Sequence, residues 1–311
     1  MKIFITPRSF GKYNQNDIKK KLDSLGINYY INDLGRSLNE IEMIDALKDV
    51  DGAIVGVDPL NKKVLEAAPN LKAIAKYGVG LDNIDLDYCK EKSIKISKTV
   101  GANSNAVADY TFALLLSVAR KVVLLDRKAR DNDYSKVIST DVYGKKIGVL
   151  GLGAIGKGVV KRAAGFGMDI YGYDIYEDKG FNTEYSVNFA SVEEILNECD
   201  FVTLHLPLSK DTKHIINKDN LNICKRDLIL INTARGGLIN EKDLYKALST
   251  KQILGAGLDV FENKDKPYEK LLELDNVVLG NHTAASTMDA TNNMTNMALE
   301  NLLTDLGFFK D

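Results

Sequence analysis

The sequence predicts an α/β protein built from two Rossmann-like domains, each with a doubly wound parallel sheet. Short apolar runs alternate with amphipathic stretches from end to end of the 311 residues, which is the pattern of parallel βαβ units. The alternation starts afresh near Gly144, where a second series of apolar runs begins. A chain of this length is too long for one small core and suits two domains.

The first series consists of strand-like apolar runs separated by amphipathic stretches. We expect its strands at residues 2–6, 28–31, 52–55, 71–75 and 95–97, and its helices around residues 16–25, 38–47, 61–67 and 86–91. A long apolar helix should follow, from about Ser104 to Asp131. Its longest apolar run, residues 113–119, falls short of the ~18 residues that a membrane span needs, so we expect a buried helix and no membrane partner.

The second series has strand-like runs at residues 147–150, 169–173, 201–204, 228–232, 253–258 and 277–279. Two helix starts are marked by capping residues. Ser191 with Glu194 fits a capping box, and Asn240 precedes an acidic first turn. The last helix should cover residues 286–306. Since no Pro/Gly-rich linker separates the two series, we expect helices to join the domains.

Composition and charge argue against several classes of partner. Hydrophobic residues make up 45% and charged residues 27%, which is ordinary for a globular protein, and the net charge of -2 does not favour nucleic acid. The three cysteines, Cys89, Cys199 and Cys224, lie far apart, as expected for reduced thiols in a cytoplasmic protein. The three histidines have no ligand-like spacing, so we expect no metal site. The apolar stretch before Thr6 is too short for a signal peptide.

A glycine-rich motif lies where the first strand of the second series should meet a helix. It reads Gly151-Leu152-Gly153-Ala154-Ile155-Gly156, and backbone N–H groups at such a turn can hold a pyrophosphate. Asp174 comes 18 residues after Gly156, close to the offset of about 20 expected for an acid that binds a ribose 2′-hydroxyl. Ile175 and Tyr176 follow in place of an arginine, so the motif predicts NAD as the cofactor. The alternative is a tight turn with a surface aspartate.

Further polar residues follow the other strands of the second series, at His205, residues 233–237, Asp259 and His282. In open α/β sheets, ligands bind beyond the carboxyl ends of the strands. Hydride transfer at a hydroxyl-bearing carbon needs a proton donor or acceptor, which suits histidine, and arginine can bind a carboxylate bidentately. We therefore expect Arg235 and His282 to act on a small 2-hydroxy acid or its 2-keto acid. The alternatives are a surface ion pair for Arg235 and a buried structural histidine.

The first series has a glycine-rich segment of its own, Lys76-Tyr77-Gly78-Val79-Gly80-Leu81-Asp82-Asn83. Asn83 stands where a dinucleotide motif needs its third glycine. We therefore expect this loop to contact something other than a dinucleotide.

These motifs together resemble the D-isomer-specific 2-hydroxyacid dehydrogenase family, in particular its phosphoglycerate dehydrogenase and hydroxypyruvate reductase branch. The residues that carry the resemblance, over essentially the whole chain, are 77–85, 101–103, 151–156, His205-Leu206-Pro207-Leu208, Asn232-Thr233-Ala234-Arg235-Gly236-Gly237 and Gly257-Leu258-Asp259-Val260-Phe261-Glu262. The resemblance implies a flavodoxin-like substrate domain of residues 1–99 plus 284–311. It also implies an NAD-binding Rossmann domain of residues 100–283, and a homodimer through that domain.

The resemblance assigns roles to individual residues of this sequence. The cofactor would be bound by Gly151, Gly153, Ala154, Ile155, Gly156, Asp174, His205, Pro207, Thr233, Ala234, Arg235, Asp259 and His282. The substrate carboxylate would be held by Lys76, Tyr77, Gly78, Val79 and Gly80, mostly through backbone N–H groups. Arg235 would also orient the substrate, and His282 would be the catalytic acid/base.

Three positions depart from the family pattern. The family places a glutamate 29 residues after its arginine to pair with the catalytic histidine, and this chain has Lys264 there. A nearby lysine lowers a histidine's pKa, so we hypothesise that Asp265 partners His282. Asn281 stands where the family often has proline. Lys76 stands where phosphoglycerate dehydrogenases tend to carry arginine, so it would either meet a substrate phosphate or be solvated at the rim of the site.

Two other functions are compatible with the same resemblance. One is an NAD-dependent dehydrogenase that acts on formate or phosphite. The other is an NAD-sensing co-regulator that keeps the fold and works by binding partners. The presence of both Arg235 and His282 favours the hydroxyacid dehydrogenase.

Overall fold

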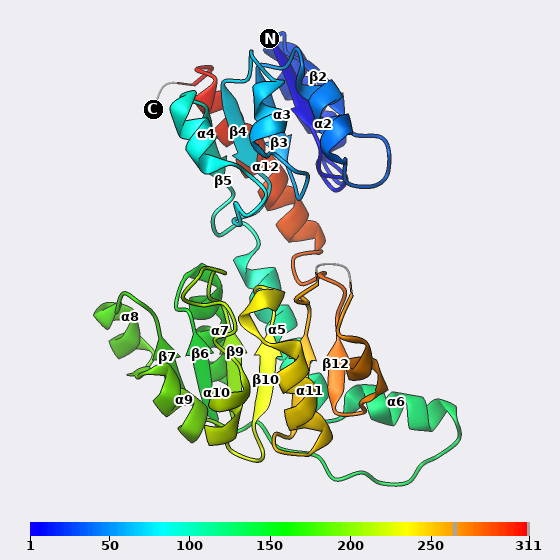
Figure 1. The fold of residues 1–311 in the computed structure, drawn as a ribbon, viewed down its shortest axis with the longest axis vertical. Helices are drawn as coiled ribbons and strands as arrows, with labels where there is room; N and C mark the ends of the chain where they lie inside the picture. The colour runs from blue at the N-terminus through cyan, green and yellow to red at the C-terminus, as the bar shows by residue number, and fades with distance from the viewer. Residues whose placement is uncertain (264–265, 310–311) are drawn as a thin grey trace. The chain divides into compact units, whose positions relative to one another are not determined.

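The computed structural model describes residues 1–263 and 266–309. The chain divides into two compact units, the first formed by Met1–Asn103 with Ser286–Asp311 and the second by Ser104–Ala285. Each unit is built on its own parallel sheet (Figure 1).

The first unit contains a five-stranded parallel sheet with the order β2-β1-β3-β4-β5. Its strands are β1 (Lys2–Ile5), β2 (Asn28–Ile31), β3 (Gly52–Val55), β4 (Ala73–Lys76) and β5 (Lys95–Lys98). This order is that of flavodoxin-like sheets. The fourth strand starts and ends later than the expected 71–75, which brings Lys76 into the strand itself.

Helices cover both faces of this sheet. They are α1 (Gln15–Ser24), α2 (Glu40–Leu47), α3 (Lys62–Glu66), α4 (Leu86–Glu91) and α12 (Met288–Asp305). On one face, Met43 and Val64 pack with Phe4 of β1 in a core that joins α2, α3 and α4 to the sheet. On the other, Leu22 and Leu299 pack with Ile3, so α1 and the C-terminal helix α12 belong to the first unit.

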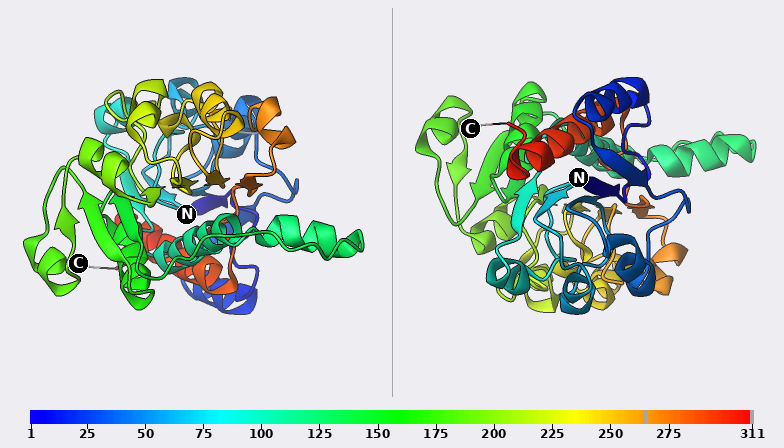
Figure 2. Two further views of the ribbon diagram at one scale, coloured as in Figure 1. Left: turned by 90° about the horizontal axis from the view of Figure 1, so that it is seen from below. Right: turned by 90° about the horizontal axis from the view of Figure 1, so that it is seen from above.

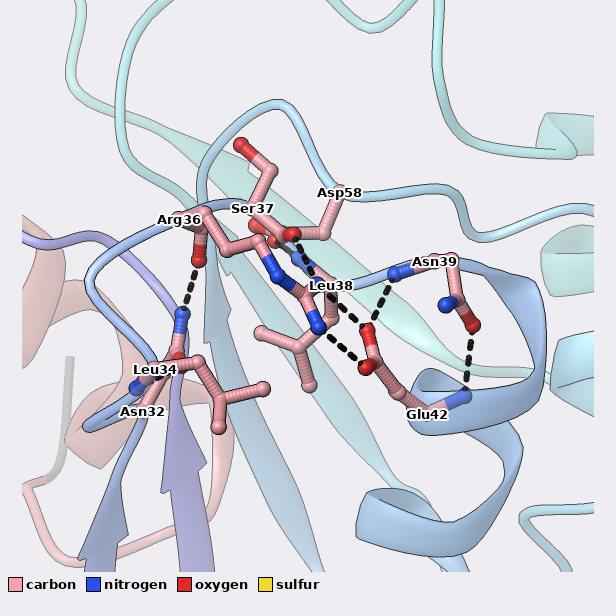
Figure 3. A network of polar contacts seen from close by, with 8 residues as sticks. All are labelled: Asn32, Leu34, Arg36, Ser37, Leu38, Asn39, Glu42 and Asp58. Carbon is pink, nitrogen blue, oxygen red and sulfur yellow. Dashed lines mark hydrogen bonds and ion pairs between the residues drawn. The ribbon is translucent and has the colours of Figure 1, made fainter.

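A closed polar network orders the loop between β2 and α2 (Figure 3). The Arg36 guanidinium binds both carboxylate oxygens of Glu42, at 2.8 and 2.6 Å. Glu42 also forms the capping box of α2 with Asn39. Arg36 and the backbone N–H of Asn39 hold the pKa of the Glu42 carboxyl at about 2, although Arg36 is exposed and Glu42 only half-buried. The Asn32 side chain binds the Arg36 carbonyl at 2.8 Å, so the loop is tied at both ends.

The second unit contains a seven-stranded parallel sheet with the order β12-β11-β10-β9-β6-β7-β8. Its strands are β6 (Lys146–Leu150), β7 (Asp169–Tyr173), β8 (Asn188–Phe189), β9 (Phe201–Leu204), β10 (Ile229–Asn232), β11 (Gly255–Leu258) and β12 (Val277–Leu279). The order reverses between β6 and β9, as in dinucleotide-binding Rossmann sheets. The predicted fold class, two doubly wound α/β parallel-sheet domains, is confirmed.

Helices also cover both faces of the larger sheet. They are α5 (Ser104–Ala119), α7 (Ala154–Gly165), α8 (Lys179–Glu184), α9 (Val192–Glu198), α10 (Lys218–Ile223) and α11 (Glu241–Ser249), with 3-10 turns at Gly236–Leu238 and Glu269–Glu273. Residues of α5 and α7 share one core with Val149 of β6, and residues of α9, α10 and α11 share the opposite core with Leu230 of β10. The predicted caps of α9 (Ser191 with Glu194) and α11 (Asn240) are both present.

The single long helix expected from Ser104 to Asp131 is wrong. Lys121 adopts a left-handed conformation (φ 54°), which ends α5 and starts a separate helix, α6 (Val122–Arg130). At the break, the apolar pattern is interrupted only by Arg120 and Lys121 and resumes at Val122, so hydrophobic periodicity did not distinguish a break from one continuous helix. The two parts also differ in environment, because α5 packs into the core whereas none of the residues of α6, all of them described, is buried.

Two features are absent from the described residues. No helix among them is both long and apolar enough to cross a bilayer. The same residues contain no group of three or more histidine, cysteine or acidic side chains placed to hold a metal ion.

Candidate active site

The glycine loop of residues 151–156 lies where the strand order of the seven-stranded sheet reverses. Gly151 follows β6 and His205 follows β9, and the backbone N–H of His205 donates to the Leu150 carbonyl at 2.7 Å. Gly151 has φ +102°, and a Cβ added there would lie 2.7 Å from the His205 carbonyl carbon. The two loops therefore meet backbone to backbone, which only glycine at 151 allows.

The first turn of α7 is left open. A Cβ at Gly156 would lie 1.9 Å from the Gly151 carbonyl oxygen, so the helix starts in direct contact with the loop before it. Gly153 stands at the N-cap, and no side chain caps the helix, whereas α9 and α11 are capped by Ser191 and Asn240. Gly153 and Ala154 are exposed and Ile155 is half-buried. Exposed, uncapped N–H groups at a helix start fit the pyrophosphate of a dinucleotide.

Asp174 follows β7 and faces the glycine loop. One of its carboxylate oxygens accepts the Leu152 N–H at 2.7 Å, and the other accepts the Tyr176 N–H at 3.3 Å. A carboxylate offers about four lone pairs, so acceptor sites remain for ribose hydroxyls. Asp174 thus shapes the loop in addition to being available to a ribose.

His205 is unsuited to proton transfer at neutral pH. Its Nε2 lies 3.0 Å from the Thr203 hydroxyl, and its buried Nδ1 has no hydrogen-bond partner in the part of the chain that the structure describes. Burial lowers the pKa of His205 to about 3, so the ring is neutral. In the same loop, the Pro207 carbonyl accepts the Thr212 hydroxyl at 2.6 Å, which ties the turn after His205.

The turn after β10 is shaped by Asn232, a fully buried residue that the sequence analysis listed only as part of a motif. Its side chain donates to the Arg235 carbonyl at 2.9 Å and accepts the Ala234 N–H at 3.0 Å. Thr233 is held from a different direction, because its hydroxyl lies 2.9 Å from that of Thr111 on α5. A polar residue at the last buried position of a strand was the available sequence signal.

Arg235 is half-buried at the end of this turn, where its Nη1 donates to the Ala234 carbonyl at 2.8 Å. The next residue, Gly236, contacts the backbone that follows β11: a Cβ there would lie 1.8 Å from the Phe261 carbonyl carbon. The Arg235 turn and the segment after Asp259 are therefore packed directly against each other.

Asp259, fully buried at the end of β11, holds the segment that contains His282. Its backbone carbonyl accepts the His282 N–H at 2.8 Å. Its carboxylate accepts the N–H groups of Thr283 and Ala284, at 3.1 and 2.9 Å. A Cβ at Gly280 would lie 2.2 Å from the same carboxylate. His282 has φ +58° and is exposed, so its ring is presented to solvent from a firmly held backbone.

Glu241, in the first turn of α11, closes the segment after Phe261, a role that sequence reasoning missed. Its two buried carboxylate oxygens accept the N–H groups of Glu262 and Tyr268, at 2.6 and 2.7 Å. Burial raises the pKa of Glu241. The Glu262 carboxylate itself lies 2.6 Å from Nε2 of His214. Lys264, which stands at the position of the family's glutamate, and Asp265, the hypothesised partner of His282, lie outside the described residues.

The loop after β4, in the first unit, contains the residues expected to bind a substrate carboxylate. Gly78 has φ +128°, and its N–H donates to the Thr99 hydroxyl at 2.8 Å. Tyr77 anchors the loop to α12 through contacts of its hydroxyl with the Thr291 carbonyl, at 3.1 Å, and the Thr295 hydroxyl, at 3.2 Å. Burial raises the pKa of Tyr77.

The remaining residues of this loop differ in exposure. Val79 is exposed and Gly80 is half-buried. Lys76, in contrast, is only 6% exposed, so the interpretation of this lysine as a solvated residue is wrong.

Comparison with known proteins identifies the larger unit. Residues 112–284 match the family model described as "D-isomer specific 2-hydroxyacid dehydrogenase, NAD binding domain". The matched segment covers more than half of the chain and lies within the second unit.

Relatives match along most of their length. A glyoxylate reductase of Korarchaeum cryptofilum is 41% identical over 269 residues, which are 84% of this chain and 81% of that protein. Among solved structures, the TT0316 protein from Thermus thermophilus superposes with a TM-score of 0.90 at 33% identity, over 100% of this chain and 98% of that one. A D-lactate dehydrogenase from Aquifex aeolicus, complexed with NAD and lactic acid, superposes with a TM-score of 0.84 at 28% identity, over 98% and 95%.

Proposed function

The chain belongs to the D-isomer specific 2-hydroxyacid dehydrogenase family, and on that premise we propose that it interconverts a small D-2-hydroxy acid and its 2-keto acid with Arg235 and His282 as catalytic residues. It is an NAD-dependent oxidoreductase. Two observations together support the proposed roles best: the Arg235 turn packs against the backbone that follows Asp259, and Asp259 itself holds the segment that contains His282.

The cofactor is proposed to bind at the carboxyl edge of the seven-stranded sheet. The open first turn of α7, at Gly153, Ala154 and Ile155, suits the pyrophosphate. The free lone pairs of Asp174 suit the ribose hydroxyls. Residues of the neighbouring loops complete the proposed cofactor contacts: Gly151, Gly156, His205, Pro207, Thr233, Ala234, Arg235, Asp259 and His282.

We propose that two kinds of donor bind the carboxylate of the substrate. Arg235 would bind it bidentately and so orient the adjacent C2 carbonyl. In the loop 76–80, the N–H groups of Tyr77 and Gly78 already donate to the Val55 carbonyl and the Thr99 hydroxyl. Those of Val79 and Gly80 would therefore bind the carboxylate, in a turn for which the positive φ of Gly78 is suited.

In the reductive direction, bound NADH supplies the hydride that adds to C2 of the keto acid. His282 gives its proton to the C2 oxygen, which becomes the hydroxyl, and the ring is then reprotonated from solvent. Arg235 stabilises the negative charge that develops on this oxygen before the proton arrives. Of the three histidines, His205 is buried and neutral and His214 is bound to Glu262, which leaves His282 as the exposed candidate.

Initial-rate loss of NADH absorbance tests the function directly. The substrates would be glyoxylate, hydroxypyruvate, pyruvate, 2-ketoisocaproate and phosphohydroxypyruvate at one pH. We expect NADH consumption with at least one of them. Silence across the panel, with NADH binding demonstrated by fluorescence, would overturn the proposal and favour the NAD-sensing co-regulator.

We further propose that the protein is a homodimer formed through α6 and the segment 131–143 that follows it. Figure 2 shows this helix and segment extending away from the seven-stranded sheet. Their apolar side chains are strongly exposed, with Ile138 at 90% and Tyr143 at 81%. Beside α6, an apolar recess of about 140 Å³ is lined by Val118, Val123 and Leu254. Exposed apolar residues next to an apolar recess are the elements of a self-complementary interface.

The oligomeric state of an Ile138→Asp variant tests this interface. A buried carboxylate without a partner is costly, so we expect the variant to elute as a monomer where the wild type is a dimer. Lys136→Asp, a change of charge at a neighbouring residue that is already polar, is the control and should stay dimeric. A wild type that is monomeric at micromolar concentration would contradict the proposal.

A cytoplasmic location is proposed from the cysteines. Cys89, Cys199 and Cys224, all in the described part of the chain, are free thiols. Burial raises the pKa of Cys89 to about 11 and that of Cys199 to about 12, so these thiols resist oxidation at neutral pH. Thiol titration of protein purified without reductant and then unfolded should find all three reduced.

A further inference from the structure

The ammonium of Lys76 is used inside the first unit. Lys76 is the last residue of β4, and its Nζ donates to the Gly56 carbonyl and, at 2.7 Å, to the Asn83 side-chain oxygen. Residues 77–82 lie between Lys76 and Asn83 in the sequence. The lysine therefore joins the start of this loop to its end, and both to the end of β3.

Asn83 extends the same connection. Its amide donates to the Gly56 carbonyl at 3.2 Å and to the Asp58 carbonyl at 2.5 Å. Its backbone carbonyl accepts the Leu60 N–H at 2.7 Å. The Gly56 carbonyl is thus shared by Lys76 and Asn83, and the loop is tied at both ends to the neighbouring segment 56–60.

We propose that Lys76 is a positioning residue, which sets the loop 77–80 for the common carboxylate of all 2-keto acid substrates and does not contact a substrate phosphate. This proposal rests on the function proposed above. A buried ammonium needs several oxygen acceptors, and the Gly56 and Asn83 oxygens supply two of them from within the unit. Because Lys76 is only 6% exposed and these two bonds draw its ammonium inward, a substrate phosphate could meet it only if the side chain left these acceptors or the segment around it opened.

The proposal makes lysine and arginine inequivalent at this position. An ammonium is compact and can point between two nearby oxygens, whereas the planar guanidinium is larger and needs acceptors arranged for a fork. An arginine in this buried position should therefore disturb the loop. At a phosphate-binding position, in contrast, arginine would serve at least as well as lysine.

Steady-state kinetics of Lys76→Met and Lys76→Arg distinguish the two roles. We expect both variants to raise KM for glyoxylate, hydroxypyruvate and phosphohydroxypyruvate by a similar factor, roughly tenfold as for loss of a charge-assisted hydrogen bond. KM for NADH should not change, because the cofactor is proposed to bind the second unit. Lys95→Met, which alters an exposed lysine on the adjacent strand β5, is the matched control and should behave as wild type.

Two outcomes would overturn the proposal. One is a loss confined to phosphohydroxypyruvate in Lys76→Met with recovery in Lys76→Arg, which identifies a phosphate contact. The other is wild-type KM for all three acids in Lys76→Met. Should Lys76→Met fail to fold, Asn83→Ala removes the same bridge from its other end, and equal losses on the three acids are again expected. Failure of the proposed function is separate, since the wild type would then reduce none of these acids.

Discussion

Both sheets have a point at their carboxyl edge where the strand order reverses, but the two points differ in what lines them. In the seven-stranded sheet, the reversal between β6 and β9 is lined by backbone, with Gly151 against His205 and the first turn of α7 uncapped. In the five-stranded sheet, the reversal lies between β1 and β3, and side chains of the protein fill it.

Asp58 is the residue that fills the smaller sheet's reversal. It is 2% exposed, and its carboxylate accepts the Thr6 hydroxyl. The same carboxylate accepts the Leu38 N–H at 2.8 Å, as Figure 3 shows. The Thr6 hydroxyl in turn accepts the Gly56 N–H at 3.0 Å. An internal carboxylate thus occupies these donors, whereas in the other unit Asp174 takes only the Leu152 N–H of the glycine loop and leaves the uncapped N–H groups at the start of α7 available for an anionic cofactor.

The difference shows that a doubly wound sheet does not by itself make a dinucleotide site. What matters is whether the donors at the reversal point are left open by glycine or used by the protein's own acid. The following predictions test this contrast, in order of decreasing effect.

The largest effect is expected for His282→Ala, which removes the proposed proton donor from the carboxyl edge of the seven-stranded sheet. Loss of a general acid costs roughly 10²–10⁴-fold in rate, and we expect kcat to fall by that order with NADH binding retained. Stopped-flow or steady-state NADH oxidation measures it. An unchanged turnover number would refute the role of His282.

Gly156→Ala should close part of the cofactor edge. The new Cβ would lie 1.9 Å from the Gly151 carbonyl oxygen, so the loop must move, at a cost of about 1–3 kcal/mol. We expect at least roughly tenfold weaker NADH binding by fluorescence titration. Gly165→Ala, in the same helix where a Cβ meets nothing within 4 Å, is the control and should bind NADH normally. Equal affinities for the two variants would show that the close approach is not required.

Asp174→Ala should make the proposed cofactor site less selective for NADH over NADPH. Removing the carboxylate takes away the ribose contact and the repulsion of a 2′-phosphate, so the preference for NADH over NADPH should fall roughly tenfold. Because Asp174 also holds the Leu152 N–H, Asp174→Asn serves as a comparison that keeps an acceptor oxygen and removes the charge. An alanine variant that stays strict for NADH would count against the ribose contact.

The smallest effect, a change in stability, is expected for Arg36→Ala, near the carboxyl edge of the five-stranded sheet. The pKa of Glu42, about 2 with Arg36 in place, should rise toward its ordinary value of 4.5 but stay below it, because the Asn39 N–H remains. A lowered carboxyl pKa contributes stability that is present above pH 4.5 and is lost as the pH falls toward 2. The stability difference between wild type and variant should therefore be small at neutral pH and vanish near pH 2.

NMR titration of Glu42 and urea unfolding at several pH values measure these two quantities. Substrate turnover should not change in Arg36→Ala. A Glu42 pKa that stays near 2 in the variant would show that the backbone contacts alone hold it down.

Most elements could be predicted because their signals are local. Buried strands such as β9 and β10 are continuous apolar runs, and the caps of α9 and α11 are short motifs. Short polar elements, such as α8 and β8, gave no periodic signal and were not predicted. The break at Lys121 was also missed, since Arg120 and Lys121, two polar residues between apolar runs, are equally compatible with one continuous helix.

The sequence by itself determined the two βαβ series, the glycine loop with its aspartate, and the residues at the strand ends, because each depends on spacing along the chain. Only the tertiary structure decided how these residues are held. Glu241 binds backbone groups 21 and 27 residues away, and the Lys76 ammonium donates to the carbonyl of Gly56, 20 residues before it. Such contacts depend on which distant segments the fold brings together. Neither the composition nor the spacing of residues along the chain predicts these contacts.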